Sequence, residues 1–234
     1  MKQLHEIQLQ ILKKLLFANS LKFSDLRPDL IIENNQLTFH LDKLIDLGYV
    51  KKSSQGYALT SIGKEYANRM DTDEVAITKQ AKIGTIVICT RNSLSEYLIY
   101  TRLKQPFYGC QGFMSGKVRF GETILQTAKR ELKEETGLEG NPTIIDIRHY
   151  LVVDKTSRDL LEDKFLYFCW VDNPKGKLEF HEEGKFEWVK EKDFASYVTN
   201  HFESFENFLR DVSLVKNFKG GIKFTEIHHR SSKF

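Results

Sequence analysis

Three glutamates near the middle of the 234-residue chain have a spacing that could support metal and phosphate chemistry. Glu131, Glu134 and Glu135 are three and four residues apart, so on a helix their side chains share one face. Carboxylates held this close raise one another's pKa unless cations neutralise them. Hard oxygen ligands suit Mg²⁺ or Mn²⁺, and these ions also bind phosphate oxygens. The spacing therefore predicts a divalent-metal site on a helix.

The segment from Thr123 to Thr136 has the pattern of the helix that this site requires. Four apolar residues recur at helical spacing and form one stripe, which the acidic face borders. These residues are Ile124, Leu125, Ala128 and Leu132. Gly137 follows directly, and glycine commonly ends helices because it adopts left-handed backbone angles easily.

The residues around this helix resemble the Nudix box, whose pattern is G-x5-E-x7-R-E-U-x-E-E-x-G-U, with U a bulky apolar residue. The chain reads Gly116, KVRFG, Glu122, TILQTAK, Arg130-Glu131-Leu132, Lys133, Glu134-Glu135, Thr136 and Gly137-Leu138. Every fixed position matches over residues 116–138. One departure precedes the box, where Ser115 stands in place of the proline–glycine approach that is common in the family.

The resemblance implies a hydrolase that directs water onto one phosphorus of a nucleoside diphosphate compound, with Mg²⁺ or Mn²⁺ as cofactor. Glu131 and Glu135 are the first metal ligands to expect, and Glu134 is either a third ligand or the base. A backbone carbonyl near Gly116 is a further candidate ligand. Glu131 and Glu134 are thus expected to be catalytic, together with Glu183, a candidate base from a loop outside the box.

Other roles follow from the same resemblance. Arg130 is expected to hold Glu122 and to brace the loop against the helix, which is structural support and not catalysis. Phe113 could stack on a base at the mouth of the site, and Arg102 could meet phosphates. Alternatively, Phe113 packs in the core and Arg102 lies on the solvated surface. Glu182 is the alternative to Glu183 as a base from outside the box. The pattern is equally typical of a solvent-exposed turn in which neither glutamate has a role in the site.

The first 72 residues have a different pattern, in which helices precede a hairpin and a further helix. The string LTFHLDKLIDLGYVKKSSQGYALTSIGKEY resembles a winged helix-turn-helix domain. In that family one helix enters the DNA major groove and the hairpin touches phosphates. The residues expected to contact double-stranded DNA are Asn35, Gln36, Thr38, His40, Lys43, Lys51 and Lys52. This segment holds ten Lys and Arg against eight Asp and Glu, so dimerisation or domain packing is the alternative.

Acidic and polar residues follow residue 72 and predict a linker over residues 73–80. Residues 81–234 then alternate strands and helices. We expect strands over 83–90, 97–101, 143–153, 165–171 and 186–189, and a helix over 194–216 before a C-terminal tail. The predicted fold class is α/β: a Nudix α/β/α sandwich with a mixed sheet, preceded by a small winged-helix domain.

Composition adds only broad limits. The net charge of +3 is too small to indicate nucleic acid or an anionic membrane. Three separated cysteines form no metal-binding or disulfide pattern, and neither a signal peptide nor a long apolar run is visible, which predicts a cytoplasmic protein without a membrane partner. Two functions are the main candidates, and a winged-helix protein-interaction module with an inert Nudix fold is a third. The chain is a hydrolase, or a regulator whose Nudix domain senses an ADP-ribose-like nucleotide. The resemblance also implies a homodimer, while the substrate is not identified.

Overall fold

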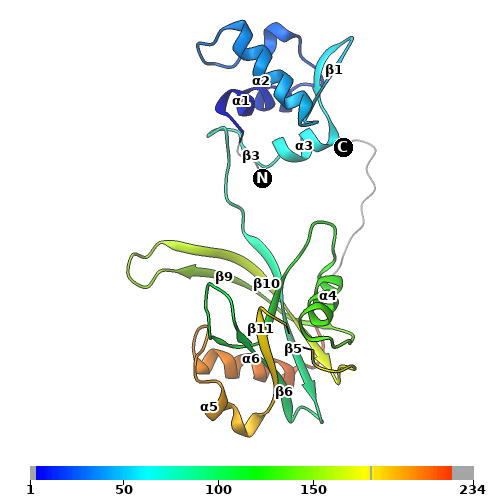
Figure 1. The fold of residues 1–234 in the computed structure, drawn as a ribbon, viewed down its shortest axis with the longest axis vertical. Coiled ribbons are helices and arrows are strands. Elements are labelled where there is room, and N and C mark those ends of the chain that lie inside the picture. The colour runs from blue at the N-terminus through cyan, green and yellow to red at the C-terminus, as the bar shows by residue number, and fades with distance from the viewer. Residues whose placement is uncertain (1–3, 180, 223–234) are drawn as a thin grey trace. The chain divides into compact units, whose positions relative to one another are not determined.

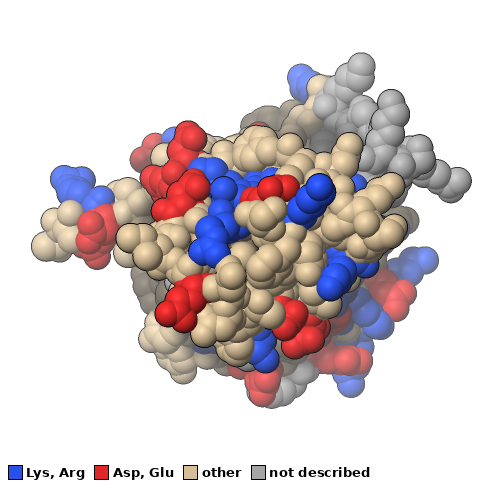
Figure 2. Space-filling model, turned by 90° about the horizontal axis from the view of Figure 1, so that it is seen from above, with Lys and Arg blue, Asp and Glu red and all other residues tan. Residues whose placement is uncertain are grey.

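The computed structural model describes residues 4–179 and 181–222, which divide into two compact units, one ending at Lys79 and the other beginning at Gln80. Each unit has its own hydrophobic core. None of the helices in the described ranges is both long and apolar enough to cross a membrane. Figure 2 shows one face of the chain, on which Lys and Arg side chains are interspersed with Asp and Glu.

The first unit packs three α-helices and a hairpin around a leucine-rich core. Its elements are α1 (Glu6–Leu16), η1 (Phe23–Leu26), α2 (Asn34–Asp46), β1 (Val50–Ser53), β2 (Gly56–Leu59), α3 (Ser61–Ala67), β3 (Met70–Asp71) and β4 (Ala76–Ile77). Helices α1 and α2 each bury an apolar stripe, at Ile11 and Leu12 and at Leu37 and Leu41. Burial of one stripe per helix is what holds these short helices in place.

The segment predicted as a linker is partly structured. Strand β4 pairs with β3 in antiparallel register, Met70 opposite Ile77 and Asp71 opposite Ala76. The side chain of Asp71 accepts hydrogen bonds from the backbone N–H groups of Asp73 and Glu74, which closes the turn. Part of residues 73–80 is therefore a hairpin and not extended chain.

The second unit is built on a mixed seven-stranded sheet with helices on both faces (Figure 1). The strand order is β11-β6-β5-β10-β9, with β7 paired to β6 and β8 paired to β5. Among the strands in the described part of the chain, β5 and β10 form the one parallel pair of this sheet. The elements are β5 (Lys82–Arg91), β6 (Glu96–Arg102), β7 (Gln111–Gly112), β8 (Met114–Lys117), α4 (Ile124–Thr136), β9 (Thr143–Val153), β10 (Leu160–Asp172), β11 (Gly184–Lys190), η2 (Glu191–Asp193), α5 (Phe194–Tyr197) and α6 (Phe205–Asn217).

Helices α4 and α6 cover opposite faces of this sheet. Ala128 and Leu132 of α4 pack in one core with Val87 of β5. Phe208 of α6 packs in a second core with Ile88, the next residue of the same strand. Successive residues of a strand point to opposite faces, so this division places one helix on each side. The predicted α/β sandwich with a mixed sheet is confirmed.

The single helix predicted over 194–216 is wrong. Two helices, α5 and α6, occupy this stretch, and the residues between them bind the edge of β7. The side chain of Gln111 accepts from the backbone N–H groups of Thr199 and Asn200 at 2.9 and 3.3 Å. The backbone N–H of Gln111 donates to the Asn200 carbonyl at 2.6 Å. Ser204 then caps α6 by accepting from Asn207 N–H. These tertiary bonds replace the helical ones.

Candidate functional site

The box residues occupy strand β8, the loop that follows it and helix α4. The helix starts at a reciprocal cap, in which the Thr123 hydroxyl accepts from Gln126 N–H at 3.2 Å and the Gln126 side chain accepts from Thr123 N–H at 2.9 Å. It ends at Gly137, whose φ of 74° is left-handed, as predicted. Both ends of the helix that carries the carboxylates are therefore set by local sequence.

Gly116 of β8 lies directly against the Glu131 side chain of α4. A Cβ atom at position 116 would overlap Cγ and Cδ of Glu131 and would lie 2.5 Å from its Oε1 atom. Glycine is thus required here for close approach, since any larger residue would push the carboxylate away. The glycine of the box makes the space in which the Glu131 carboxylate sits.

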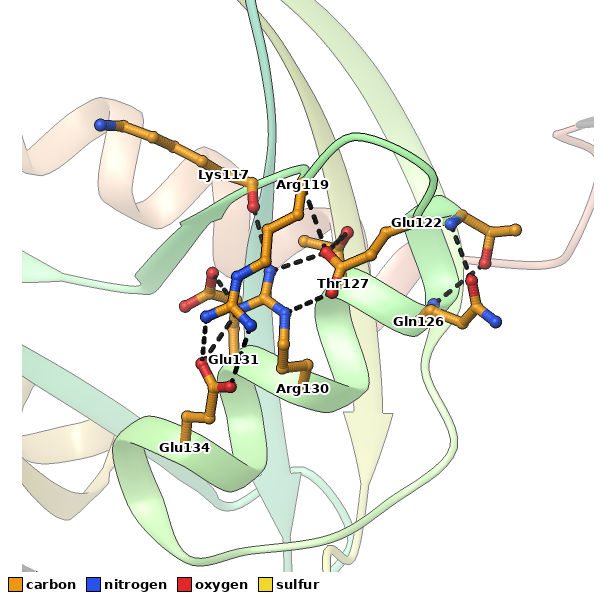
Figure 3. A network of polar contacts seen from close by, with 9 residues as sticks. Lys117, Arg119, Glu122, Gln126, Thr127, Arg130, Glu131 and Glu134 are labelled. Carbon is orange, nitrogen blue, oxygen red and sulfur yellow. Dashed lines mark hydrogen bonds and ion pairs between the residues drawn. The ribbon is translucent and has the colours of Figure 1, made fainter.

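Arg130 joins the loop to the helix (Figure 3). Its Nε and Nη2 atoms donate to the two oxygens of Glu122 at 2.5 and 2.8 Å, and its Nη1 atom donates to Glu131 at 2.7 Å. Nη2 also donates to the Lys117 carbonyl at 3.1 Å. Hydrogen bonds from Arg130 hold the pKa of Glu122 low, at about 2, and the Glu122 bonds raise the pKa of Arg130 further.

Glu134 points toward two arginines instead of toward the other carboxylates (Figure 3). Arg119 of the loop donates to both of its oxygens, at 3.0 and 3.3 Å, and Arg130 donates at 3.1 Å. The side chain remains 46% exposed. Glu134 is therefore accessible to solvent and is held by the positive charges of Arg119 and Arg130.

Glu135 is half-buried on the same face of α4 as Glu131. Burial raises its pKa to about 7, and the neighbouring Glu131 carboxylate adds to this shift, while the Lys104 charge opposes it. A cation bound beside Glu131 and Glu135 would offset this repulsion and favour the charged form of Glu135. Glu131 and Glu135 thus form a pair of hard oxygen donors on one helix face, which fits a divalent ion such as Mg²⁺ or Mn²⁺. Within the described ranges, no three acidic, His or Cys side chains converge as a ready-made metal cluster.

A cavity of about 690 Å³ opens beside this helix face. It is lined by most of the residues expected at the site: Arg102, Phe113, Gly116, Glu131, Glu134, Glu135 and Glu183. Glu122 and Arg130 do not line it and stand behind the carboxylates. The structure thus brings together residues that are up to 81 positions apart, and it separates supporting residues from those that face the cavity.

On the cavity rim, Arg102 and Glu183 already have partners. Arg102 donates from Nε to the Pro106 carbonyl at 2.6 Å and from Nη2 to the Gln105 carbonyl at 3.3 Å, which stabilises the loop after β6. Lys104 forms an ion pair with Glu183. The neighbouring Glu182 is exposed and does not line the cavity, so the structure favours Glu183 of the two.

Phe113 contributes to both the cavity and the core. It is only 6% exposed, and its ring stacks on Phe208 of α6 with centroids 5.2 Å apart. Most of its surface is therefore already covered by protein, and its edge forms part of the cavity wall.

The far wall of the cavity was not predicted. Tyr150, Phe168 and Asp211 come from β9, β10 and α6, and Arg148 lies behind them. The Arg148 guanidinium stacks 4.2 Å from the Phe168 ring centre, donates to Asp211 at 2.7 Å and donates to Asp146 at 2.7 Å. Burial raises the pKa of Asp211 to about 6. No spacing in the sequence connects these residues, because three separate elements bring them together. Arg119 was also missed, at a variable position of the box.

In the first unit, six of the seven residues expected to contact DNA are exposed: Asn35, Gln36, Thr38, Lys43, Lys51 and Lys52. His40 differs, because its ring stacks on His5 with centroids 4.5 Å apart and its Nδ1 atom is buried without a partner. Burial lowers the pKa of His40. Gln36 also serves the fold, since its side chain accepts from the backbone N–H of Glu33 at the start of α2.

In comparisons with known proteins, separate family models match the two units. The model of the NUDIX domain family matches residues 81–211, and the model of a domain of unknown function, DUF7347, matches residues 4–70. An ADP-ribose pyrophosphatase of Methanocaldococcus jannaschii is 30% identical over 90 residues, which cover 37% of this chain and 52% of that protein. The matched region thus spans about half the length of the curated relative.

Solved structures of Nudix proteins are similar to part of this chain. The NUDIX domain of Shewanella oneidensis NrtR, crystallised with ADP ribose, has a TM-score of 0.50 and 16% identity, over 68% of this chain and 97% of that one. A MutT protein of Bacillus halodurans has a TM-score of 0.46 and 26% identity, over 56% and 82% of the two chains. Since the family model covers more than half of the sequence and includes the whole glutamate helix and its glycine, the chain belongs to the Nudix family.

Proposed function

We propose that the second unit hydrolyses a nucleoside diphosphate derivative such as ADP-ribose with the help of Mg²⁺ or Mn²⁺. The observation that carries this proposal is the pair Glu131 and Glu135, one against Gly116 and the other half-buried, on the wall of a large cavity. The cavity volume is in the range of small-molecule sites. The name of the curated relative supports ADP-ribose as the first substrate to test.

In this proposal Glu131 and Glu135 hold the cation, and Glu134 or the Gly116 backbone completes the set. A bound divalent ion supplies neutralisation of phosphate charge and activation of water. Arg119 and Lys104 line the same cavity and are placed to attract the diphosphate.

Hydrolysis joins a water oxygen to one phosphorus and breaks that phosphorus's bond to the bridging oxygen. The displaced bridging oxygen leaves with the second phosphoryl group, so two phosphorylated fragments result. A carboxylate must take the proton from water as the oxygen attacks. Glu183 is our first candidate for this base because it lines the cavity on the side of β11, and Glu134 is the second.

The proposal is tested with a panel of nucleoside diphosphate compounds, ADP-ribose included, in the presence of Mg²⁺ or Mn²⁺. Glu135→Gln should lower kcat/KM at least about 100-fold, since even residues that only support metal ligands contribute 10- to 100-fold. Glu139→Gln is the matched control, because Glu139 follows the same helix, is exposed and does not line the cavity. Absence of activity across the panel, or equal activity of Glu135→Gln and wild type, would exclude the hydrolase.

A second function, a nucleotide-responsive regulator, is favoured by the exposed polar residues of the first unit. In this proposal residues 1–72 are a winged helix-turn-helix domain, residues 73–80 connect it, and the Nudix domain starts at residue 81. Asn35 and Lys43 on α2 would face base edges and phosphates, and Lys51 on the β1–β2 hairpin would face phosphates. Residues 1–72 hold ten Lys and Arg against eight Asp and Glu, so any binding would depend on few phosphate contacts.

The regulator is tested by a gel shift against the DNA upstream of the gene, with and without ADP-ribose. Lys51→Ala should weaken the shift and reduce its salt dependence by about one phosphate contact. Lys64→Ala, at an exposed lysine of α3, is the control. If no shift occurs with any nucleotide, the first unit has another role, and the hydrolase proposal is unaffected.

A further inference from the structure

The cavity extends well beyond the pair Glu131 and Glu135. Many of its lining residues form consecutive cross-strand rows over β8, β5, β10 and β9, on the face of the sheet that α6 covers. These rows are Lys117, Gly84 and Leu166; Ser115, Ile86 and Phe168; and Lys82, Lys164 and Tyr150. Neighbouring strands lie about 4.8 Å apart, so the three steps from β8 to β9 cover about 14 Å. The cavity can therefore hold a ligand that is longer than a diphosphate.

This face of the sheet, the cavity floor, is apolar at its centre and polar at its rim. Four central positions bear no polar side-chain atom: Gly84, Ile86, Leu166 and Phe168. At the rim, Lys82 and Lys164 both donate to Glu162, at 3.2 and 2.8 Å, so part of their charge is already neutralised. An apolar floor of this kind suits a flat ring such as a nucleobase.

Helix α6 adds polar groups along one side of the floor. Asn207 and Asp211, one helical turn apart, both line the cavity, and Asn207 already donates from Nδ2 to Glu203 at 2.7 Å. The two basic residues of α6, Arg210 and Lys216, do not line the cavity. This side of the floor therefore offers hydrogen-bond acceptors to a ligand, and no positive charge from α6.

Asp211 is the acceptor on this side whose position is best fixed. Its Oδ1 atom accepts from Arg148 at 2.7 Å, and its side chain is only 18% exposed. Arg148 is held in turn by Asp146 at 2.7 Å and also donates to the Tyr150 hydroxyl at 3.2 Å. Within the described ranges, the Oδ2 atom of Asp211 accepts no hydrogen bond. A largely buried carboxylate oxygen without a donor is unfavourable, so a ligand that donates to it is stabilised there.

We propose that Asp211 is a specificity-determining residue, whose Oδ2 atom accepts a hydrogen bond from the nucleoside end of a bound nucleotide. The inference rests on the proposed function, in which the cation held by Glu131 and Glu135 binds the diphosphate beside β8. The nucleoside then lies along the apolar floor toward α6 and β9. The group that Asp211 recognises is an uncharged donor, either the amino group of a base or a sugar hydroxyl. A base with a carbonyl oxygen at this point is disfavoured, because two acceptors would face each other.

Isothermal titration calorimetry of the full chain with AMP, IMP and ribose phosphate tests this role. None of the three probes contains a diphosphate, so binding is measured without hydrolysis, and IMP has a carbonyl where AMP has its amino group. A buffer of about pH 8 keeps Asp211 ionised, since burial raises its pKa only to about 6. Wild type should bind AMP at least about 10-fold more tightly than IMP, the usual contribution of a hydrogen bond to a charged group.

Asp211→Asn should reverse this preference. Arg148 requires an acceptor, so the amide oxygen of the new side chain would face Arg148 and the amide NH₂ group would face the cavity. A donor then stands in place of Oδ2, and IMP should bind more tightly than AMP. Asp211→Ala provides neither group and should bind AMP and IMP equally. Glu206→Gln, at an exposed position of α6 outside the cavity, is the matched control and should bind all probes as wild type does. Circular dichroism checks that each variant is folded.

Two outcomes support the role of Asp211 and identify the donor. A preference for AMP that Asp211→Asn reverses assigns the donor to the amino group of the base. Equal binding of AMP and IMP by wild type, with at least about 10-fold weaker binding of any probe to Asp211→Ala, assigns it to a sugar hydroxyl. The proposal is overturned if both variants bind the three probes as wild type does, or if wild type binds none of them.

The same measurements separate this inference from the proposed hydrolase. Binding of AMP that depends on Asp211, without turnover of any diphosphate in the substrate panel, would overturn the hydrolase alone. Turnover by a protein whose nucleotide binding does not change in Asp211→Asn and Asp211→Ala would overturn the role of Asp211 alone.

Discussion

Gly116→Ala tests whether the position of the Glu131 carboxylate depends on a single missing Cβ atom. The new methyl group would stand 2.5 Å from Glu131 Oε1 and would overlap the two preceding carbons. Carbon atoms in ordinary contact are about 3.5 Å apart, whereas Glu131 Cδ would be 2.1 Å from the new methyl group, so the carboxylate must retreat by more than about 1 Å. Displacements of about 1 Å at a catalytic site can reduce the rate about 100-fold, or about 2.7 kcal/mol of transition-state stabilisation.

The same substitution should lower stability moderately, because two effects of opposite sign combine. Gly116 does not have a positive φ angle, so alanine adopts its backbone conformation, and glycine to alanine in a strand stabilises by about 0.5–1 kcal/mol. The displaced Glu131 loses its 2.7 Å bond from Arg130, which costs about 1.5–3 kcal/mol. These opposing effects leave a net loss of at most about 2–3 kcal/mol.

Steady-state hydrolysis of ADP-ribose, Mn²⁺ binding by electron paramagnetic resonance and thermal melting together separate these effects. Gly121→Ala is the matched control in the adjacent loop. Its φ is 89° and its Cβ would meet no atom within 4 Å, so it should cost about 1–2 kcal/mol of stability and preserve Mn²⁺ binding. A Gly116→Ala protein with wild-type Mn²⁺ affinity and wild-type kcat/KM would show that Glu131 does not act from the position described.

Three further outcomes are expected. Arg130 lowers the pKa of Glu122 to about 2, so the contribution of Glu122 to stability is complete above about pH 4.5 and is lost as the pH falls to 2. The difference in melting temperature between wild type and Glu122→Gln should therefore vanish at about pH 2. Asp211 has its pKa raised to about 6, so the folded state gains stability as the pH falls from 6 to 4. Asp211→Asn should remove this gain, up to about 3 kcal/mol by urea unfolding. Gly63→Ala should destabilise the first unit by about 3 kcal/mol or more in the same assay, because the new Cβ would overlap the backbone carbonyl of Tyr49, and unchanged stability would contradict this packing.

The glutamate helix could be read from sequence because its determinants are local. The cap at Thr123, the apolar stripe and the stop at Gly137 all lie within the helix or beside it, and helical geometry alone places Glu131 and Glu135 on one face. The mixed sheet could also be predicted, since long apolar runs alternate with one strongly helical segment.

Elements whose partners are distant in sequence were not predicted. The break between α5 and α6 depends on Gln111, which lies 88 positions before Thr199, and no local pattern in 194–216 indicates it. The short strands β7 and β8 are glycine-containing and have no alternating pattern of their own. They exist because β5 and β6 provide backbone partners.

The sequence by itself determined which residues have the chemistry, because the box specifies residue types at offsets that a helix converts into positions. Only the tertiary structure decided how these residues are used. It turned Glu134 toward Arg119 and buried Glu135 beside a cavity. It also built the far wall from Tyr150 and Asp211. Burial and charge at each carboxylate arise from neighbours on other elements, and these neighbours come together only when the sheet and helices pack.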